Sequence, residues 1–290
     1  MKRLSALLSV VLLSACQHTA QTVTAFQPAD LSEISGLTTL PSGAYAAVND
    51  SGNTADLFTL TDSLNPAQRF ATTLENRDWE DMAFVDLPEG RLLVIADTGD
   101  NLRRHDASHL YFFRWPAEAS EPVPAGQLRF RFEDGPVNCE AVFYAAAERR
   151  FYLLSKGRGE SDIYTLDWPL PDAADDTVQL AEKQAVLNGV SPSAAGKLFA
   201  AVTGVNPETP TGAAISGDGR QLAVLTYRSV WLWQNPDRAS WQNVLQHPPQ
   251  LLGKHRLTQA EAISFSADGR SLVIASEGNP PQFKTLSPAR

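Results

Sequence analysis

Carboxylate side chains crowd the two ends of one short apolar stretch of this sequence. The segment NRDWEDMAF, residues 76–84, places four ionisable side chains immediately before an apolar run, and the run RLLVIADTGDN that follows ends in two more aspartates. Carboxylates gathered in a partly buried place repel one another, so either their pKa values rise or they bind a cation. Calcium prefers such ligands, namely carboxylates, amide oxygens and backbone carbonyls. The pattern therefore indicates cation binding.

Five stretches repeat the order of an acidic or polar residue, a short strand, a tight turn, a stronger strand and a polar loop. They begin at Glu33, Glu80, Glu140, Thr211 and Glu261, which lie 47, 60, 71 and 50 residues apart. One four-stranded blade of a β-propeller takes roughly 40–50 residues, so each interval holds one blade and its loop insertions. We therefore predict an all-β fold, a β-propeller that forms a single domain over residues 22–290.

The spacing fits five blades, and six would need a further blade inside the 71-residue interval, where GKLFAAVTG (residues 196–204) is a candidate fragment. Only 29 residues follow Glu261, which is enough for two or three strands. We expect residues 21–26 to supply the missing outer strand, so that N- and C-terminal strands pair and close the ring. Such closure removes exposed sheet edges.

The repeated acids are expected to meet at one mouth of the central channel. Antiparallel pairing brings the end of each second strand beside the start of the first, and the inner hairpin of a blade lines the channel. The aligned residues that end the second strands are Asp50, Asp97, Lys156, Tyr227 and Glu277. Two carboxylates about 8 Å apart repel by about 2 kcal/mol at an effective dielectric constant near 20. Four glutamates and up to three further acids would then meet there, namely Glu33, Glu80, Glu140 and Glu261 with Asp50, Asp97 and Glu277, and we predict a divalent-cation site with calcium as the ion.

Neighbouring loops add oxygen donors to the predicted cation site, and two other roles for its acids stay open. The loops NDSGN and DTGDN offer Asn49, Asn53, Asp100 and Asn101 as further oxygen donors. Alternatively, Lys156 neutralises Glu140 and the acids are structural, bound to backbone amides or water. A third reading makes them catalytic.

Other chemistry-bearing residues are weaker candidates. His105 and His109 are four residues apart and would suit zinc on a helix, although surface histidines are the preferred reading. Trp79 could stack on a ligand or pack against a neighbouring blade, and we expect Cys139 to be a buried, inert thiol. The sequence contains no nucleophile elbow, phosphate-binding glycine loop, H-E-x-x-H or C-x-x-C motif.

The first residues have the plan of an export signal. Lys2 and Arg3 precede an apolar stretch that is too short to span a membrane, and LSAC at residues 13–16 resembles a bacterial lipobox. We predict a signal peptide over residues 1–15, an acylated Cys16, a tether over residues 16–21 and a place on the periplasmic face of the outer membrane.

The composition limits the partners. Loss of residues 1–15 would take the formal net charge from −9 to −11, which argues against nucleic acid. With Cys16 acylated, Cys139 has no partner for an intrachain disulfide. We expect a monomer that is attached to the membrane through Cys16 and meets an envelope protein or a small molecule at the channel mouth.

The repeats resemble the SdiA-regulated family of bacterial propellers, which is distantly related to NHL-repeat proteins. The resemblance rests on EISGLT with AAVNDSGN and WEDMAF with LLVIADTGDN, and more loosely on CEAVFY and AEAISF. It implies a five-bladed propeller with a calcium site and no established activity. Thr211 and Lys156 depart from the acidic pattern, so the candidate ligands that the resemblance implies are Glu33, Asp50, Glu80, Asp97, Glu140 and Glu261.

Two enzymatic alternatives follow from other resemblances. The layout is also similar to the six-bladed gluconolactonase and regucalcin group, in which a central divalent ion polarises a lactone. A five-bladed glycosidase would use two rim carboxylates about 5–9.5 Å apart. The leading prediction is a non-catalytic binding or scaffold role, and the alternative is a metal-dependent hydrolase of a lactone, ester or sugar. An open coordination position, with Trp79, His105 or Lys156 above it, would favour the enzyme.

Overall fold

The computed structural model describes residues 23–24, 26–115, 121–157, 160–167 and 177–287. The predicted signal peptide, Cys16 and the tether lie outside these residues. In the part of the chain described, no helix is both long and apolar enough to cross a membrane.

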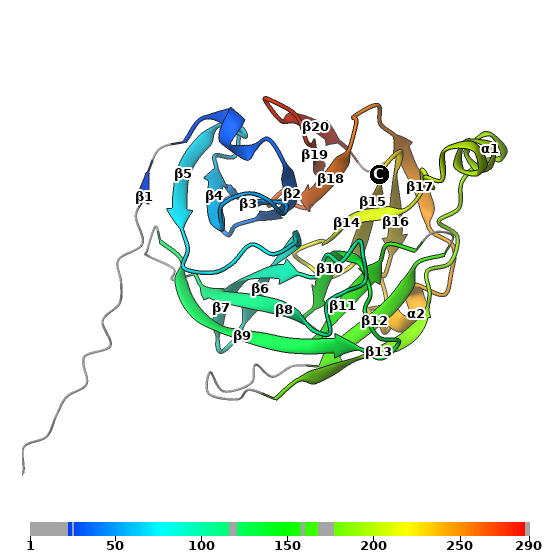
Figure 1. The fold of residues 1–290 in the computed structure, drawn as a ribbon, viewed down its shortest axis with the longest axis horizontal. Helices are drawn as coiled ribbons and strands as arrows, with labels where there is room; N and C mark the ends of the chain where they lie inside the picture. The colour runs from blue at the N-terminus through cyan, green and yellow to red at the C-terminus, as the bar shows by residue number, and fades with distance from the viewer. Residues whose placement is uncertain (1–22, 25, 116–120, 158–159, 168–176, 288–290) are drawn as a thin grey trace, which may run out of the picture.

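The described strands form five consecutive antiparallel units (Figure 1). The first contains β2 (Ile34–Thr39), β3 (Tyr45–Asn49), β4 (Asp56–Leu60) and β5 (Pro66–Ala71). The second contains β6 (Trp79–Leu87), β7 (Gly90–Asp97), β8 (Ser108–Arg114) and β9 (Val123–Phe132). The third contains β10 (Cys139–Ala145), β11 (Arg150–Ser155), β12 (Asp162–Asp167) and β13 (Gln179–Val186). The fourth contains β14 (Pro210–Ile215), β15 (Gln221–Thr226), β16 (Ser229–Gln234) and β17 (Gln250–Lys254), and the fifth contains β18 (Ala260–Phe265), β19 (Leu272–Ser276) and β20 (Gln282–Leu286).

The first strands of the units form a closed inner ring. Each of β2, β6, β10, β14 and β18 contacts the next, and β18 lies against β2. The outer strands β9 and β13 also pair in parallel, which joins the second and third units into one sheet. This arrangement is a β-propeller and confirms the predicted fold class.

Apolar clusters fill the spaces between neighbouring units. Along β7, Leu93 packs toward the first unit, whereas the adjacent Val94 packs toward the third. Successive strand residues point to opposite faces, so a strand covered on both faces must be apolar at every position. This explains the continuous apolar run LLVIA (residues 92–96), and it leaves the ends of the inner strands as the place for charged groups.

The predicted closing strand lies elsewhere. β1 (Val23–Thr24) pairs with β5, the outer strand of the first unit, and not with β20. The segment that follows explains this: Phe26 is buried against Phe58 of β4, with ring centroids 4.8 Å apart, and the 3₁₀ helix η1 (Pro28–Leu31) leads directly into β2. The ring closes instead through the contact of β18 with β2.

The segment proposed as part of a sixth blade is a helix. α1 (Ala194–Thr203) begins after Ser193, whose side chain accepts a hydrogen bond from the Gly196 N–H, and ends at Gly204 in the left-handed conformation. These are the N-cap and C-cap signals of a helix in an alanine-rich stretch. A second short helix, α2 (Trp241–Val244), packs against the third unit through Trp241.

Candidate metal centre at the channel mouth

Each inner strand starts with a β-bulge, and this bulge decides which side chains reach the mouth. In β6, Trp79 pairs with Asp97 and Asp81 pairs with Ala96, so Glu80 has no partner across the hairpin. The other inner strands show the same register shift. The residues left out of the ladder are Ser35, Glu80, Glu140, Thr211 and Glu261. A bulge bends the strand and turns its extra residue away from the ladder.

The bulge corrects the sequence alignment of the first two repeats. Ser35, not Glu33, is the structural equivalent of Glu80. Glu33 is instead equivalent to Asp78: the Asp50 N–H donates to the Glu33 carbonyl at 2.8 Å, and the Thr98 N–H donates to the Asp78 carbonyl at 3.2 Å. Thr98, not Asp97, is thus equivalent to Asp50. The sequence alignment matched acidic residues of different repeats to one another. It could not show the bulged residue, which has no partner across the hairpin.

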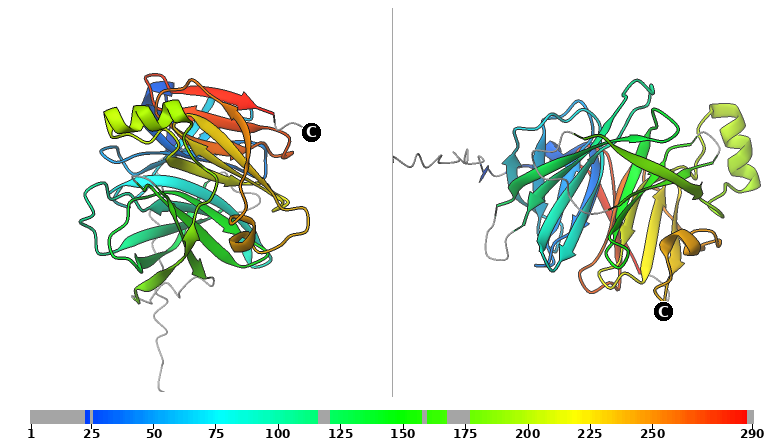
Figure 2. Two further views of the ribbon diagram at one scale, coloured as in Figure 1. Left: turned by 90° about the vertical axis from the view of Figure 1, so that its right-hand side faces the viewer. Right: turned by 90° about the horizontal axis from the view of Figure 1, so that it is seen from below.

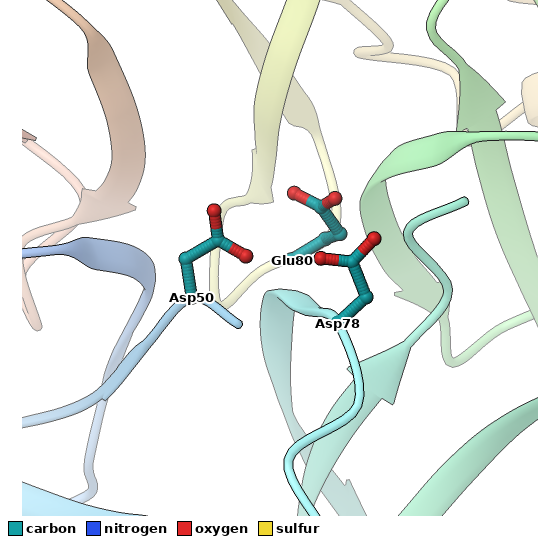
Figure 3. A group of neighbouring side chains, drawn as sticks. All are labelled: Asp50, Asp78 and Glu80. Atoms are coloured by element: carbon teal, nitrogen blue, oxygen red, sulfur yellow. The ribbon is translucent and has the colours of Figure 1, made fainter. Parts of the chain in front are cut away.

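Three carboxylates from two units converge at the mouth (Figure 3). Asp50 follows β3 of the first unit, Asp78 precedes β6 of the second, and Glu80 is the bulged residue of β6. One oxygen of each lies within 4.8 Å of the others. Asp50 also forms a second group of this kind with Glu261 and Glu277 of the fifth unit.

Glu80 is the most deeply buried member of the first group. It is 5% exposed, and its carboxylate is influenced by burial and neighbouring charges, with no hydrogen bond from the described residues. Burial raises its pKa well above the usual value, and the charges of Glu140, Asp50 and Asp78 add to the effect. A buried acid without a donor or paired cation is costly. A cation held between Glu80, Asp50 and Asp78 would remove that cost.

The pKa values of other carboxylates at the mouth are raised in the same way. Burial raises the pKa of Asp50 to about 7, although the N–H of Ser51 opposes the shift. Burial, followed by the charge of Glu277, raises the pKa of Glu261 to about 9. A divalent cation would replace the protons that these groups otherwise retain.

Gly99 permits a close backbone approach to the carboxylates. A Cβ atom at this position would overlap Oε1 of Glu80 and the carboxyl group of Asp78. The Gly99 N–H donates to the Asp78 carbonyl at 3.1 Å, which fixes the loop after β7 over the cluster. Only glycine leaves this room.

The remaining predicted ligands lie near the cluster but have other partners. Asp97 accepts hydrogen bonds from the Asp78 N–H at 3.0 Å and the Tyr111 hydroxyl at 3.2 Å, so it positions Asp78. Glu140 accepts from Asn138 Nδ2 at 2.8 Å and pairs with Lys156 Nζ at 2.8 Å. Glu33 is exposed and accepts from Asn53 Nδ2.

The additional oxygen donors mostly organise loops. Asp100 accepts from the backbone N–H groups of Arg104 and His105, each at 2.8 Å. Asn49 donates to the Asp30 carbonyl at 2.8 Å, and Asn101 accepts from Asn138 at 3.1 Å.

The weaker candidates are not brought together at the mouth. His105 is exposed in a loop, and His109 lies in β8, where it stacks on Tyr111 with 5.7 Å between centroids, so this segment is not the helix that a zinc pair requires. Trp79 is fully buried in the core between the first two units. Cys139 is buried as expected, and burial raises the pKa of its thiol.

Sequence reasoning missed two acids, Asp78 and Asp81. Asp78 stands in the segment NRDWEDMAF, but the repeat alignment gave it no equivalent. Asp81 is fully buried and accepts backbone N–H groups from Met82 at 2.8 Å, Val142 at 2.9 Å and Ala213 at 3.2 Å. It therefore joins three inner strands and is not a ligand.

The donor set fits a hard cation. Asp50, Asp78 and Glu80 offer carboxylate oxygens, without the thiolate or imidazole that zinc and copper prefer. Asp50 and Asp78 are half-buried, so part of the coordination shell would face solvent. Calcium takes six to eight oxygen ligands, so water would complete the shell.

Comparison with known proteins finds similar solved structures but no similar sequence. No family model and no curated protein sequence matches it. A PQQ-bound aldose sugar dehydrogenase from Streptomyces coelicolor is similar with 10% identity over 92% of this chain and 98% of that one, at a TM-score of 0.45. The β-propeller domain of Cps50 (Swd1) from Myceliophteria thermophila has 11% identity over 92% and 99% of the two chains, at a TM-score of 0.42. An auxiliary nutrient binding protein from Bacteroides thetaiotaomicron has 12% identity over 89% and 70%, at a TM-score of 0.45. Similarity at this level carries no inference about activity.

Proposed function

We propose that this protein is an envelope-tethered β-propeller that binds a divalent cation, calcium, at the channel mouth and has a non-catalytic binding or scaffold role. The cation is held by Asp50, Asp78 and Glu80. The observation that carries the proposal is Glu80: a buried carboxylate that faces two others and receives no hydrogen bond from the described residues. The resemblance of EISGLT and WEDMAF to SdiA-regulated propellers supports calcium as the ion.

Calorimetric titration with calcium tests the cation site. The full chain in detergent, after treatment with a chelator, is expected to bind calcium with measurable heat. Glu80→Gln and Asp78→Asn each remove one charged ligand, so each should weaken binding at least about tenfold.

Asp62→Asn is the matched control, because it removes one acid from an exposed loop outside the mouth. It should bind as the parent chain does. The proposal fails if the parent chain shows no binding, or if Asp62→Asn weakens it as much as Glu80→Gln does.

A metal-dependent hydrolase of a lactone, ester or sugar is the second candidate. The half-exposed Asp50 and Asp78 favour it, because an ion there would keep positions open to a substrate. Of the three side chains expected above such an ion, Trp79 is buried, His105 is exposed in a loop, and Lys156 alone lies among the mouth residues. The binding role is therefore the better supported of the two.

A further inference from the structure

Lys156 occupies a ring position that carries acids in other units. It follows the last paired residue of β11, as Asp50 follows β3 and Glu277 follows β19. Thr98 and Tyr227 stand at the same position in the second and fourth units. The mouth thus contains one ammonium group where its symmetry would permit another carboxylate.

The ammonium group is held firmly between two units. Nζ lies 2.8 Å from Oε1 of Glu140 and 5.5 Å from the centroid of the Tyr227 ring, and the side chain is 26% exposed. Burial, the largest influence, would by itself lower the pKa of Lys156, but the charges and hydrogen bonds of Glu140 and Tyr227 together outweigh it and raise the pKa, so the group stays protonated. Glu140 in turn is 2% exposed and would be an unpaired buried acid without this partner.

The charge of Lys156 also reaches the acids outside its own ion pair. It acts on Glu80, Glu261 and Glu277, and for each it opposes the rise in pKa that burial causes. Lys156 therefore already supplies part of the positive charge that a bound ion would bring to this mouth.

We propose that Lys156 is a built-in cation that limits calcium binding: it withholds Glu140 from coordination and weakens the ion's attraction to Glu80. This inference rests on the proposed cation site. It makes Lys156 the residue that sets affinity and stoichiometry, so the mouth binds fewer ions, and more weakly, than its acids would permit.

Calcium titration of Lys156 variants tests the inference. Lys156→Met removes the charge and frees Glu140, so it should bind calcium at least about tenfold more tightly, or bind an additional ion. Lys156→Gln removes the charge but keeps an amide that donates to Glu140, and it should show the gain even if the Met variant folds poorly. Lys156→Arg should bind as the parent does.

Two controls separate a local effect from one of net charge. Lys254→Met removes an exposed lysine outside the mouth and should leave binding unchanged. The double change Glu140→Gln with Lys156→Met removes both partners of the ion pair and should return the affinity toward that of the parent.

The melting temperature of Lys156→Met should be lower in EDTA and restored by calcium, because the ion then pairs with Glu140.

The outcomes distinguish this inference from the proposed function. If the parent binds calcium and both neutral Lys156 variants bind with the same affinity and stoichiometry, the inference is overturned while the cation site stands. Binding by the variants but not by the parent would support the role of Lys156 and contradict cation binding by the native chain. Absence of binding in all of them overturns both.

Discussion

Asp50 is the residue shared by both carboxylate groups of the mouth, and its protonation should control ion binding. Burial raises its pKa to about 7, and the nearby Asp78 contributes to the rise. Calcium requires the ionised carboxylate, so binding at lower pH must displace a proton.

We therefore expect calcium affinity to fall as the pH drops below about 7, by about tenfold per pH unit for each displaced proton. Stability without calcium should change in the opposite sense. The folded chain retains a proton that the unfolded chain, with its ordinary aspartate pKa of 3.8, releases, so this contribution is lost as the pH rises through about 7.

Titrations at pH 5.5 and 7.5, with melting curves in EDTA at the same values, measure both effects. An affinity that does not change over this range would contradict the assignment of Asp50 as a ligand.

At the scale of residues, the sequence predicted that carboxylates converge at the mouth, but not all of the residues that do so. Asp50 and Glu80 were expected at the mouth, and the structure places them there with oxygens close together. Asp97 was expected as a ligand, but the bulge moves it one position back, where it binds the Asp78 N–H. A bulge is set by pairing across the hairpin, so an alignment of residue types could not reveal the shift.

At the scale of elements, Asp81 connects inner strands that are far apart in sequence. Asp81 belongs to β6. Its carboxylate accepts hydrogen bonds from the Val142 N–H of β10 and the Ala213 N–H of β14. Backbone groups at an inner sheet edge have no strand to pair with, so a buried acceptor at the channel axis satisfies two of them.

Asp81→Asn replaces one accepting oxygen with a donor that faces other donors. We expect a loss of about 1–3 kcal/mol in the free energy of unfolding, measured by urea denaturation.

Asp86→Asn is the matched control on the same strand, because Asp86 is exposed and forms a surface ion pair with Arg91 at 3.5 Å. Its effect should stay within about 0.5 kcal/mol. Equal stability of the two variants would show that Asp81 does not join the strands.

Two elements, the expected closing strand and the candidate fragment of a sixth blade, differ from the expectation for different physical reasons. β-propeller strands were read from alternating and continuous apolar runs, and these predict the inner hairpins well. The short pairing of β1 depends instead on Phe26 against Phe58, which is a contact distant in sequence, whereas the helix α1 depends on the local caps at Ser193 and Gly204. The caps were visible in the sequence, whereas the partner of Phe26 was not, because contacts distant in sequence decide it.

At the scale of the whole molecule, the chain enters the propeller from its side. β1 lies at the outer edge of the first unit, on the side of the ring opposite α1 (Figures 1 and 2). An anchor that precedes β1 is therefore connected at the outer edge of the propeller and not at the carboxylate mouth. Tethering and cation binding should then be separable properties.

Cys16→Ser tests this separation. In cells fed a labelled fatty acid, the variant should lose the label and leave the membrane fraction, because acylation requires the thiol. Its calcium affinity in solution should equal that of the parent, since Asp50, Asp78 and Glu80 belong to the folded propeller. Cys139→Ala, which changes the buried cysteine, should keep the label. Retention of the label in Cys16→Ser would exclude Cys16 as the anchor, and loss of calcium binding in that variant would show that the N-terminal segment contributes to the mouth.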